Sequence, residues 1–89
     1  MKYNQFKQRV ENDLGFTVLD FDDGTRFKKI SVVDDFDNQL VEIDKYHSYH
    51  IDFFSKPLTR FYNGFEDRER IKLLMLLSIE LTTTPVPER

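Results

Sequence analysis

The chain has 89 residues, no cysteine and a net charge of −3 at pH 7. This length suits one domain with one core, and the missing cysteines exclude disulfides, cysteine–zinc sites and thiol chemistry. A hydrophobic fraction of 39% beside a charged fraction of 33% is typical of a folded protein. The acidic balance gives no general attraction to nucleic acid, because phosphate contacts need clustered Lys and Arg.

Apolar runs are short throughout the sequence. The longest one, Leu73 to Leu77, is far below the ~20 residues that a membrane-spanning helix needs. The segment MKYNQFKQRVENDLG also has no apolar core of the kind found in signal peptides. We therefore expect a cytoplasmic protein that has no membrane partner.

The first segment, YNQFKQRVENDLG, carries its apolar residues at helical spacing. Spacings of three and four residues place them on one face of an α-helix. These residues are Tyr3, Phe6, Val10 and Leu14. Asn4 is suited to cap the start of this helix, and Gly15 is suited to end it.

From Phe16 onward the apolar residues alternate with a period of two, which indicates β-strands. Strands are predicted in residues 16–22, 26–34, 39–44 and 49–54. Turns separate them at DDGT, where Asp23-Gly24 favours a tight hairpin, at DFDN and at KYHS. Four short strands with short connections predict an antiparallel meander.

The segment after the sheet predicts two more helices. Pro57 fits the first turn of a short helix behind Ser55, which Asn63-Gly64 would end. A final helix opens at Glu66 or Asp67, where acidic side chains suit the helix dipole. The order α-β-β-β-β-α predicts an α+β fold, in which a four-stranded antiparallel meander carries N- and C-terminal helices packed on one face.

The end of the chain is predicted to leave the helix. Thr82 to Thr84 are poor helix formers, and Pro85 disfavours helical geometry at the residue before it. The sequence therefore divides into a single domain, residues 1–84, and a short extended tail, residues 85–89. The tail is interpreted either as a frayed end or as a peptide that docks on a partner.

The final helix, which contains IKLLMLLSIEL, is apolar almost all the way round. An ordinary surface helix has one apolar stripe, so this helix must be covered on more than one side. The cover could come from the sheet, the first helix and the turn at residues 62–65. It could also come from a second copy of the chain, because exposed apolar patches usually mark interfaces. The possible oligomer face consists of Leu73, Met75, Leu76 and Ile79.

The C-terminal segment also carries a resemblance to a group of proteins. The matching positions are Leu73, Leu77, Leu81, Thr84, Pro85 and Arg89. With the meander before them and the helix start DRERIKLLMLL, they resemble small uncharacterised proteins encoded by phages and prophages of Gram-positive bacteria. The resemblance implies an N-terminal helix, a few strands, and a last helix that runs into a threonine-proline-arginine tail, inside a bacterial host cell. It implies no catalytic residues, because the group has no assigned activity.

Motifs for catalysis or metal binding fail on their spacing. LDFDDGT, Leu19 to Thr25, is similar to the aspartate loop of haloacid-dehalogenase-type phosphatases, but Asp23 spoils the spacing to Gly24. The same stretch lacks the ligand positions of an EF-hand loop. His47 and His50 are three residues apart in a turn and strand, where odd spacing points side chains to opposite faces. We therefore expect no enzyme, no metal site, no cofactor and no small-molecule substrate.

Charged residues gather in two parts of the sequence. The turns of the meander predict an acidic interaction edge, made of Asp22, Asp23, Asp34, Asp35 and Asp37. The connection before the last helix predicts a basic and aromatic patch, made of Lys56, Arg60, Phe61, Tyr62, Arg68 and Arg70. Basic residues interleaved with aromatic ones can bind single-stranded nucleic acid by stacking and phosphate contact, although Glu66, Asp67 and Glu69 dilute this patch.

Three functional hypotheses follow. The leading one is a small phage-derived module without catalysis that binds another protein, as an accessory factor or inhibitor, through the acidic edge. The second is weak binding of single-stranded nucleic acid through the basic and aromatic patch. Nucleic acid is the less favoured partner, because the chain has a net negative charge. The third is a structural subunit of a homo-oligomer, most simply a homodimer.

Overall fold

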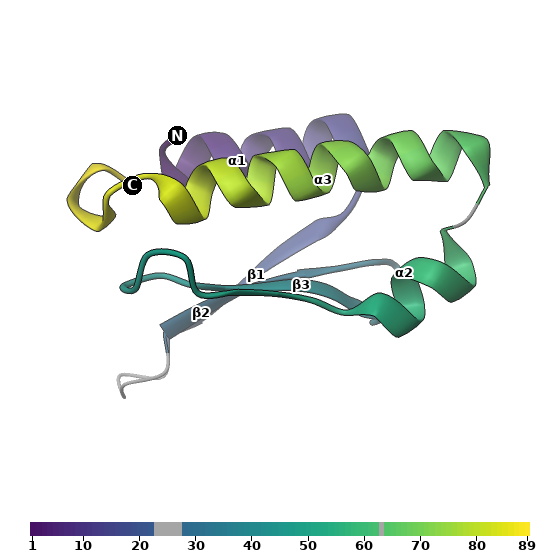
Figure 1. The fold of residues 1–89 in the computed structure, drawn as a ribbon, viewed down its shortest axis with the longest axis horizontal. Helices are drawn as coiled ribbons and strands as arrows, with labels where there is room; N and C mark the ends of the chain where they lie inside the picture. The colour runs from purple at the N-terminus through teal and green to yellow at the C-terminus, as the bar shows by residue number, and fades with distance from the viewer. Residues whose placement is uncertain (23–27, 63) are drawn as a thin grey trace.

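Two helices lie over one face of a single four-stranded sheet, and no described helix covers the opposite face (Figure 1). The computed structural model describes residues 1–22, 28–62 and 64–89. Its helical elements are α1 (Tyr3–Arg9), the π-helical turn η1 (Val10–Leu14), α2 (Ser55–Phe61), α3 (Phe65–Thr83) and the 3-10 turn η2 (Val86–Glu88). Its strands are β1 (Thr17–Asp22), β2 (Lys28–Val33), β3 (Gln39–Asp44) and β4 (Ile51–Phe53).

The sheet is an antiparallel meander in the order β1-β2-β3-β4. This topology, with α1 and α3 on one face, confirms the predicted α+β fold. The predicted hairpin turn at Asp23-Gly24 lies outside the described residues. β4 begins at Ile51, later than predicted, because Tyr49 has a φ of 68°, and this left-handed conformation does not continue a strand.

A β-bulge turns Leu40 toward the core. Val33 pairs with Gln39 and Val32 pairs with Val41, so β3 has one residue more than β2 at this point. Because a bulge breaks the alternation of side chains between the two faces, Leu40 and Val41 are neighbours in sequence and are both fully buried.

The first helix starts at a different residue from the one predicted and ends at the predicted glycine. It begins at Tyr3, two residues earlier than the predicted cap at Asn4 would allow. The N-cap is Lys2, whose backbone N–H donates a hydrogen bond to Gln5 Oε1 at 2.9 Å. At the other end, Gly15 has a φ of 74° and closes the π-helical turn, as expected of a glycine that stops a helix.

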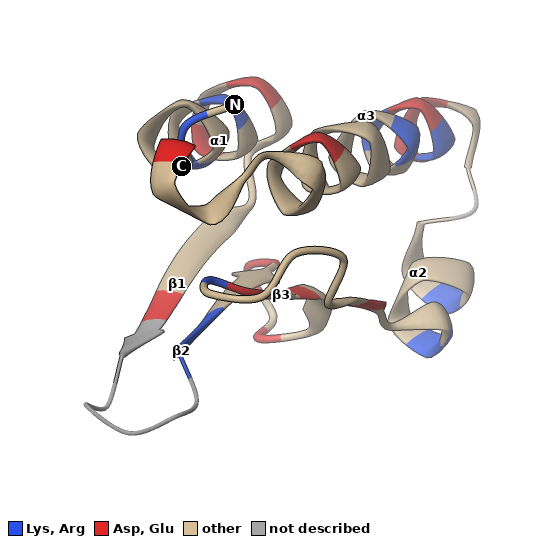
Figure 2. Ribbon diagram, turned by 60° about the vertical axis from the view of Figure 1, so that its left-hand side comes forward, with Lys and Arg blue, Asp and Glu red and all other residues tan. Residues whose placement is uncertain are grey.

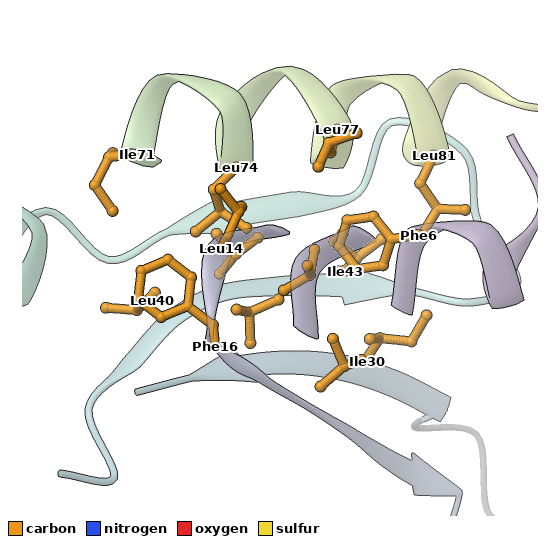
Figure 3. Packing of buried hydrophobic residues seen from close by; sticks show 14 of the residues in the cluster. Phe6, Leu14, Phe16, Ile30, Leu40, Ile43, Ile71, Leu74, Leu77 and Leu81 are labelled. Atoms are coloured by element: carbon orange, nitrogen blue, oxygen red, sulfur yellow. The ribbon is translucent and has the colours of Figure 1, made fainter. Parts of the chain in front are cut away.

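The core lies between α1, α3 and the inner face of the sheet (Figure 3). Every labelled side chain in that view points into the space between the helices and the strands. The buried apolar residues of the helices are Phe6, Val10 and Leu14 from the first helix and Ile71, Leu74, Leu77 and Leu81 from α3. The first of these groups contains three of the four residues of the predicted helical face, and the fourth, Tyr3, is half-buried against the core.

The cover that α3 receives from its own chain is one-sided. Leu76 and Ile79 remain 56% and 46% exposed, and Leu73 and Met75 are half-buried. The sheet and α1 therefore bury one broad side of the helix and leave the other to solvent. Within the described residues, no helix combines the length and the apolarity that crossing a bilayer requires.

The last residues fold back onto the domain and do not extend away from it. The Arg89 guanidinium donates hydrogen bonds to four backbone carbonyl oxygens at 2.9–3.0 Å, those of Asp44, Lys45, Thr82 and Thr84. The carbonyl of Arg89 accepts a hydrogen bond from the backbone N–H of Tyr3 at 3.1 Å. The segment predicted as an extended tail thus ties the end of α3 to the end of β3 and the start of α1.

Two adjacent leucines of α3 allow a direct test of this one-sided burial. Leu77→Ala is expected to lower the free energy of unfolding by about 2–5 kcal/mol, because the side chain is 2% exposed and its removal leaves a cavity. Leu76→Ala is expected to change it by less than about 0.5 kcal/mol. Urea unfolding of both variants at low protein concentration measures the difference, and similar values would contradict the orientation of α3.

Candidate functional site

One buried carboxylate, that of Asp34, organises the turn between β2 and β3. Its Oδ1 accepts hydrogen bonds from the backbone N–H groups of Phe36 and Asn38, both at 2.9 Å. Its Oδ2 accepts from Asn38 Nδ2 at 2.9 Å and from the Tyr62 hydroxyl at 2.7 Å. Asp37 completes the turn with a φ of 61°, a conformation that aspartate adopts more readily than most residues. The carboxylate therefore shapes the turn and ties it to the segment between α2 and α3.

The ionisation of this pair follows from its surroundings. Burial alone would raise the pKa of Asp34, but hydrogen bonds from Tyr62, Asn38 and the Phe36 backbone outweigh it and hold the pKa below its usual value. Burial, together with the hydrogen bond to Asp34, raises the pKa of Tyr62. At neutral pH the carboxylate is thus a charged acceptor and the phenol a neutral donor, the combination that gives short, strong hydrogen bonds.

The ring of Tyr62 is also held from the core side. It meets the buried ring of Phe16 edge-on, with centroids 5.7 Å apart and an interplanar angle of 87°, a favourable aromatic geometry. The guanidinium of Arg70 lies 4.6 Å from the Phe16 ring centroid and donates a hydrogen bond to the carbonyl of Leu14. Tyr62 is therefore fixed by the core on one side and by Asp34 on the other.

Above this network lies an open hollow of about 560 Å³. Asp34, Asn38 and Tyr62 line it together with two aromatic walls, Phe36 and Phe61. The walls are solvent-facing, with Phe36 84% and Phe61 51% exposed. The hollow can therefore take up an apolar side chain between two rings, and its polar groups can orient the backbone of that segment.

The predicted acidic edge is only partly on the surface. Asp34 is 5% exposed and both of its oxygens are occupied by internal hydrogen bonds, so its carboxylate is not presented at the surface with the other acids. Asp35 and Asp37 are exposed on either side of Phe36. The remaining members of the edge fall outside the described part of the structure, namely the side chain of Asp22 and the whole of Asp23.

The predicted basic and aromatic patch is also divided by the structure. Lys56, Arg60 and Arg68 are exposed, and Figure 2 shows α2 with basic residues only and α3 with both charge signs along its first half. Arg70 is half-buried and is held by Phe16, so it does not present its charge with the others. The Tyr62 hydroxyl is occupied by its internal hydrogen bond.

The two histidines lie together and not on opposite faces as predicted. The rings of His47 and His50 are stacked, with centroids 5.4 Å apart, because both residues belong to the β3–β4 loop, where strand alternation does not apply. Asp44 Oδ1 lies 3.1 Å from His47 Nδ1. These side chains line a polar hollow of about 540 Å³ together with Glu42 and Asp52. In the part of the chain that the structure describes, no group of three or more His, Asp or Glu side chains is placed to hold a metal ion.

A smaller apolar hollow lies beside α3. It has a volume of about 330 Å³ and is lined by Tyr62, Arg68, Ile71, Lys72, Met75 and Leu76. Two of the four residues of the predicted oligomer face, Met75 and Leu76, belong to it. The hollow continues the exposed apolar surface of the helix toward α2.

Comparison with protein-family models, curated proteins and solved structures gave no match to this chain. The candidate site is therefore interpreted from its own geometry. Sequence reasoning missed Phe36 and Asn38 as members of the site. Their signal is present in the turn DFDN, where a large ring stands among polar residues that favour turns.

The hydrogen-bond network of Asp34 predicts a specific loss of stability. Asp34→Ala is expected to lower the free energy of unfolding by about 2–3 kcal/mol, because it leaves several partly buried donors without their acceptor. The matched control, Asp35→Asn in the exposed neighbouring position, is expected to stay within about 0.5 kcal/mol of the wild type. Equal stability of the two variants in urea unfolding at pH 7 would contradict the role given to the carboxylate.

The depressed pKa of Asp34 also predicts a pH dependence. Its contribution to stability is fully present above the unfolded-state pKa of about 3.9 and is lost as the pH falls through the lower folded-state pKa. The wild type should therefore lose stability more steeply below about pH 4 than Asp34→Asn, which has no proton to take up there. Urea unfolding of both proteins across this range measures how steeply each unfolding free energy changes with pH. Equal pH dependence in the two proteins would exclude a lowered pKa for Asp34.

Proposed function

We propose that this chain is a small protein-binding module, an accessory or inhibitory factor, whose partner binds at the hollow between Phe36 and Phe61. The observation that carries the proposal is the 84% exposure of Phe36 in a turn whose backbone is fixed by Asp34. Large apolar side chains exposed next to one another usually mark an interaction surface. Rigid aromatic anchors give much contact area at a low cost in conformational entropy.

The charges around the hollow indicate the chemistry of the partner. Asp35 and Asp37 are exposed on either side of Phe36, so a basic residue of the partner would find a carboxylate next to the ring. An apolar side chain beside a lysine or arginine fits this arrangement, with the apolar group between the rings and the cation against the carboxylates. The acidic-edge hypothesis is thereby kept, with its centre moved from Asp34 to Phe36.

The resemblance to small proteins of phages and prophages belongs to the same proposal. A phage-derived accessory factor or inhibitor would work in the cytoplasm of the bacterial host and bind a host or phage protein with a basic surface, such as a nucleic-acid enzyme. The proposed role is binding, without a catalytic step.

Binding of single-stranded nucleic acid remains the alternative function. Lys56 and Arg60 are exposed on α2 near Phe61, which could stack on a base. Against this alternative, Arg70 is engaged by Phe16, and the other wall of the hollow carries acidic side chains that repel phosphate.

Selection from a random peptide library tests the proposed function. Peptides that bind the wild-type protein are expected to carry a large apolar residue beside Lys or Arg. Phe36→Ala is expected to weaken the best peptide about tenfold or more, because it removes one wall of the hollow. Fluorescence anisotropy with the labelled peptide measures the loss.

Phe65→Ala is the matched control for this experiment. Phe65 is 83% exposed but does not line the hollow, so its removal should leave the peptide affinity unchanged. An equal loss in both variants, or no loss in Phe36→Ala, would refute the site. Displacement of the peptide by a single-stranded oligonucleotide at physiological salt would favour the alternative.

A further inference from the structure

The outer side of α3 is apolar at its centre and charged on both sides of that centre. Leu76 and Ile79 are the exposed large apolar residues of this stretch. Lys72 stands one turn before Leu76 and Glu80 one turn after it, and both are exposed. Neither charge forms an ion pair with another residue that the structure describes.

This charge pattern is complementary to itself. Lys72 and Glu80 lie four residues on either side of Leu76, so all three share one side of the helix. Consider a two-fold axis that lies between two copies of α3 at the level of Leu76 and is perpendicular to both helices. This axis relates the two helices as an antiparallel pair. It brings Lys72 of each copy level with Glu80 of the other. A parallel pair would instead set like charges level with each other, so the charges favour the antiparallel arrangement.

The shape of the surface fits the same arrangement. The hollow of about 330 Å³ lies on the flank of Lys72 and Met75, on the N-terminal side of Leu76. Ile79 follows Met75 by four residues and therefore lies on the same flank, on the C-terminal side of Leu76. The two-fold axis places Ile79 of each copy over the hollow of the other, where its half-exposed side chain gains apolar contact.

We propose that two copies of this chain associate through α3 in an antiparallel pair whose two-fold axis passes at Leu76. The proposal goes beyond the binding of a partner at Phe36, which is not part of this face. The 19 residues of α3 give a helix about 28 Å long, and one helix face of this length buries less than the ~800 Å² per partner of a standard interface. The dimer is therefore a weak one, and its population depends on concentration.

Sedimentation equilibrium between about 1 μM and about 1 mM tests the association. The mass of the wild type is expected to rise with concentration from 10.7 kDa toward twice that value. Leu76→Glu is expected to stay at the monomer mass, and because Leu76 is largely exposed the variant should fold, which circular dichroism checks. A wild type that remains monomeric throughout, or a Leu76→Glu variant that associates like it, would overturn the proposal.

A charge-swap cycle tests the antiparallel register. Lys72→Glu and Glu80→Lys are each expected to raise the dissociation constant about tenfold, because each substitution makes both symmetric contacts repulsive. The double variant restores opposite charges and should return close to the wild-type value. Lys7→Glu, a charge reversal at an exposed position of α1, is the control and should have no effect. A double variant as weak as the single ones would rule out this register.

Introduced cysteines give an independent test, since the chain has none of its own. Lys72→Cys and Glu80→Cys proteins, mixed under mild oxidation, are expected to form mainly the mixed disulfide, because these positions lie level in the antiparallel pair. In that pair, two copies of the same position are about 12 Å apart along the helix axis. A product made mainly of same-site disulfides would contradict the proposed register.

Discussion

Burial of one side of α3 against α1 and the sheet is the constraint on which the rest of the molecule depends. A two-layer fold has one interior, between its layers. A helix in such a layer is covered by the sheet and by the neighbouring helix. Its outer side faces solvent, because no third layer packs on it. Ile71, Leu74 and Leu77 point into that interior, whereas Leu76 and Ile79 cannot reach it. The apolar character of α3 around its whole circumference therefore exceeds what this fold can bury by itself.

A second constraint comes from the buried charge of Asp34. A carboxylate removed from water is costly unless donors surround it, and here backbone and side-chain donors occupy both oxygens. Because Tyr62 is one of these donors and also packs on Phe16, its side chain attaches the turn to the core. The rigidity that places Phe36 at the surface is thus a consequence of interactions beneath it.

Much of the fold follows from local sequence patterns. The helical spacing of the first segment and the period of two after Phe16 gave the order of elements, because side-chain direction repeats every 3.6 residues in a helix and every two in a strand. Gly15 ended its helix as predicted, since the left-handed conformation there suits a residue without a side chain. These signals are local, and they need no knowledge of distant contacts.

The features that local patterns failed to predict depend on partners far away in the sequence. Asp34 looked like one more surface acid, because the hydrogen bond that ties its carboxylate to the core comes from Tyr62, 28 residues later. Arg70 looked available for nucleic acid, but its guanidinium donates a hydrogen bond to the carbonyl of Leu14, which lies 56 residues earlier in the sequence. Arg89 was placed in an extended tail because prolines precede it, whereas its hydrogen bonds reach back to the end of β3. The extra residue at Leu40 also breaks the alternation on which strand predictions rest.

The two proposed surfaces have a geometric relation that follows from the chain order. Tyr62, which lines the hollow at Phe36, comes just before α3, so this hollow lies at the end of the molecule where α3 begins (Figure 1). In an antiparallel pair the two starting ends of α3 point away from each other, and the dimer would carry its two partner sites at opposite ends. A partner that repeats its binding segment could then engage both sites and gain avidity without any new contact. A partner with a single segment would bind each end separately, and the weak dimer would add nothing to its affinity.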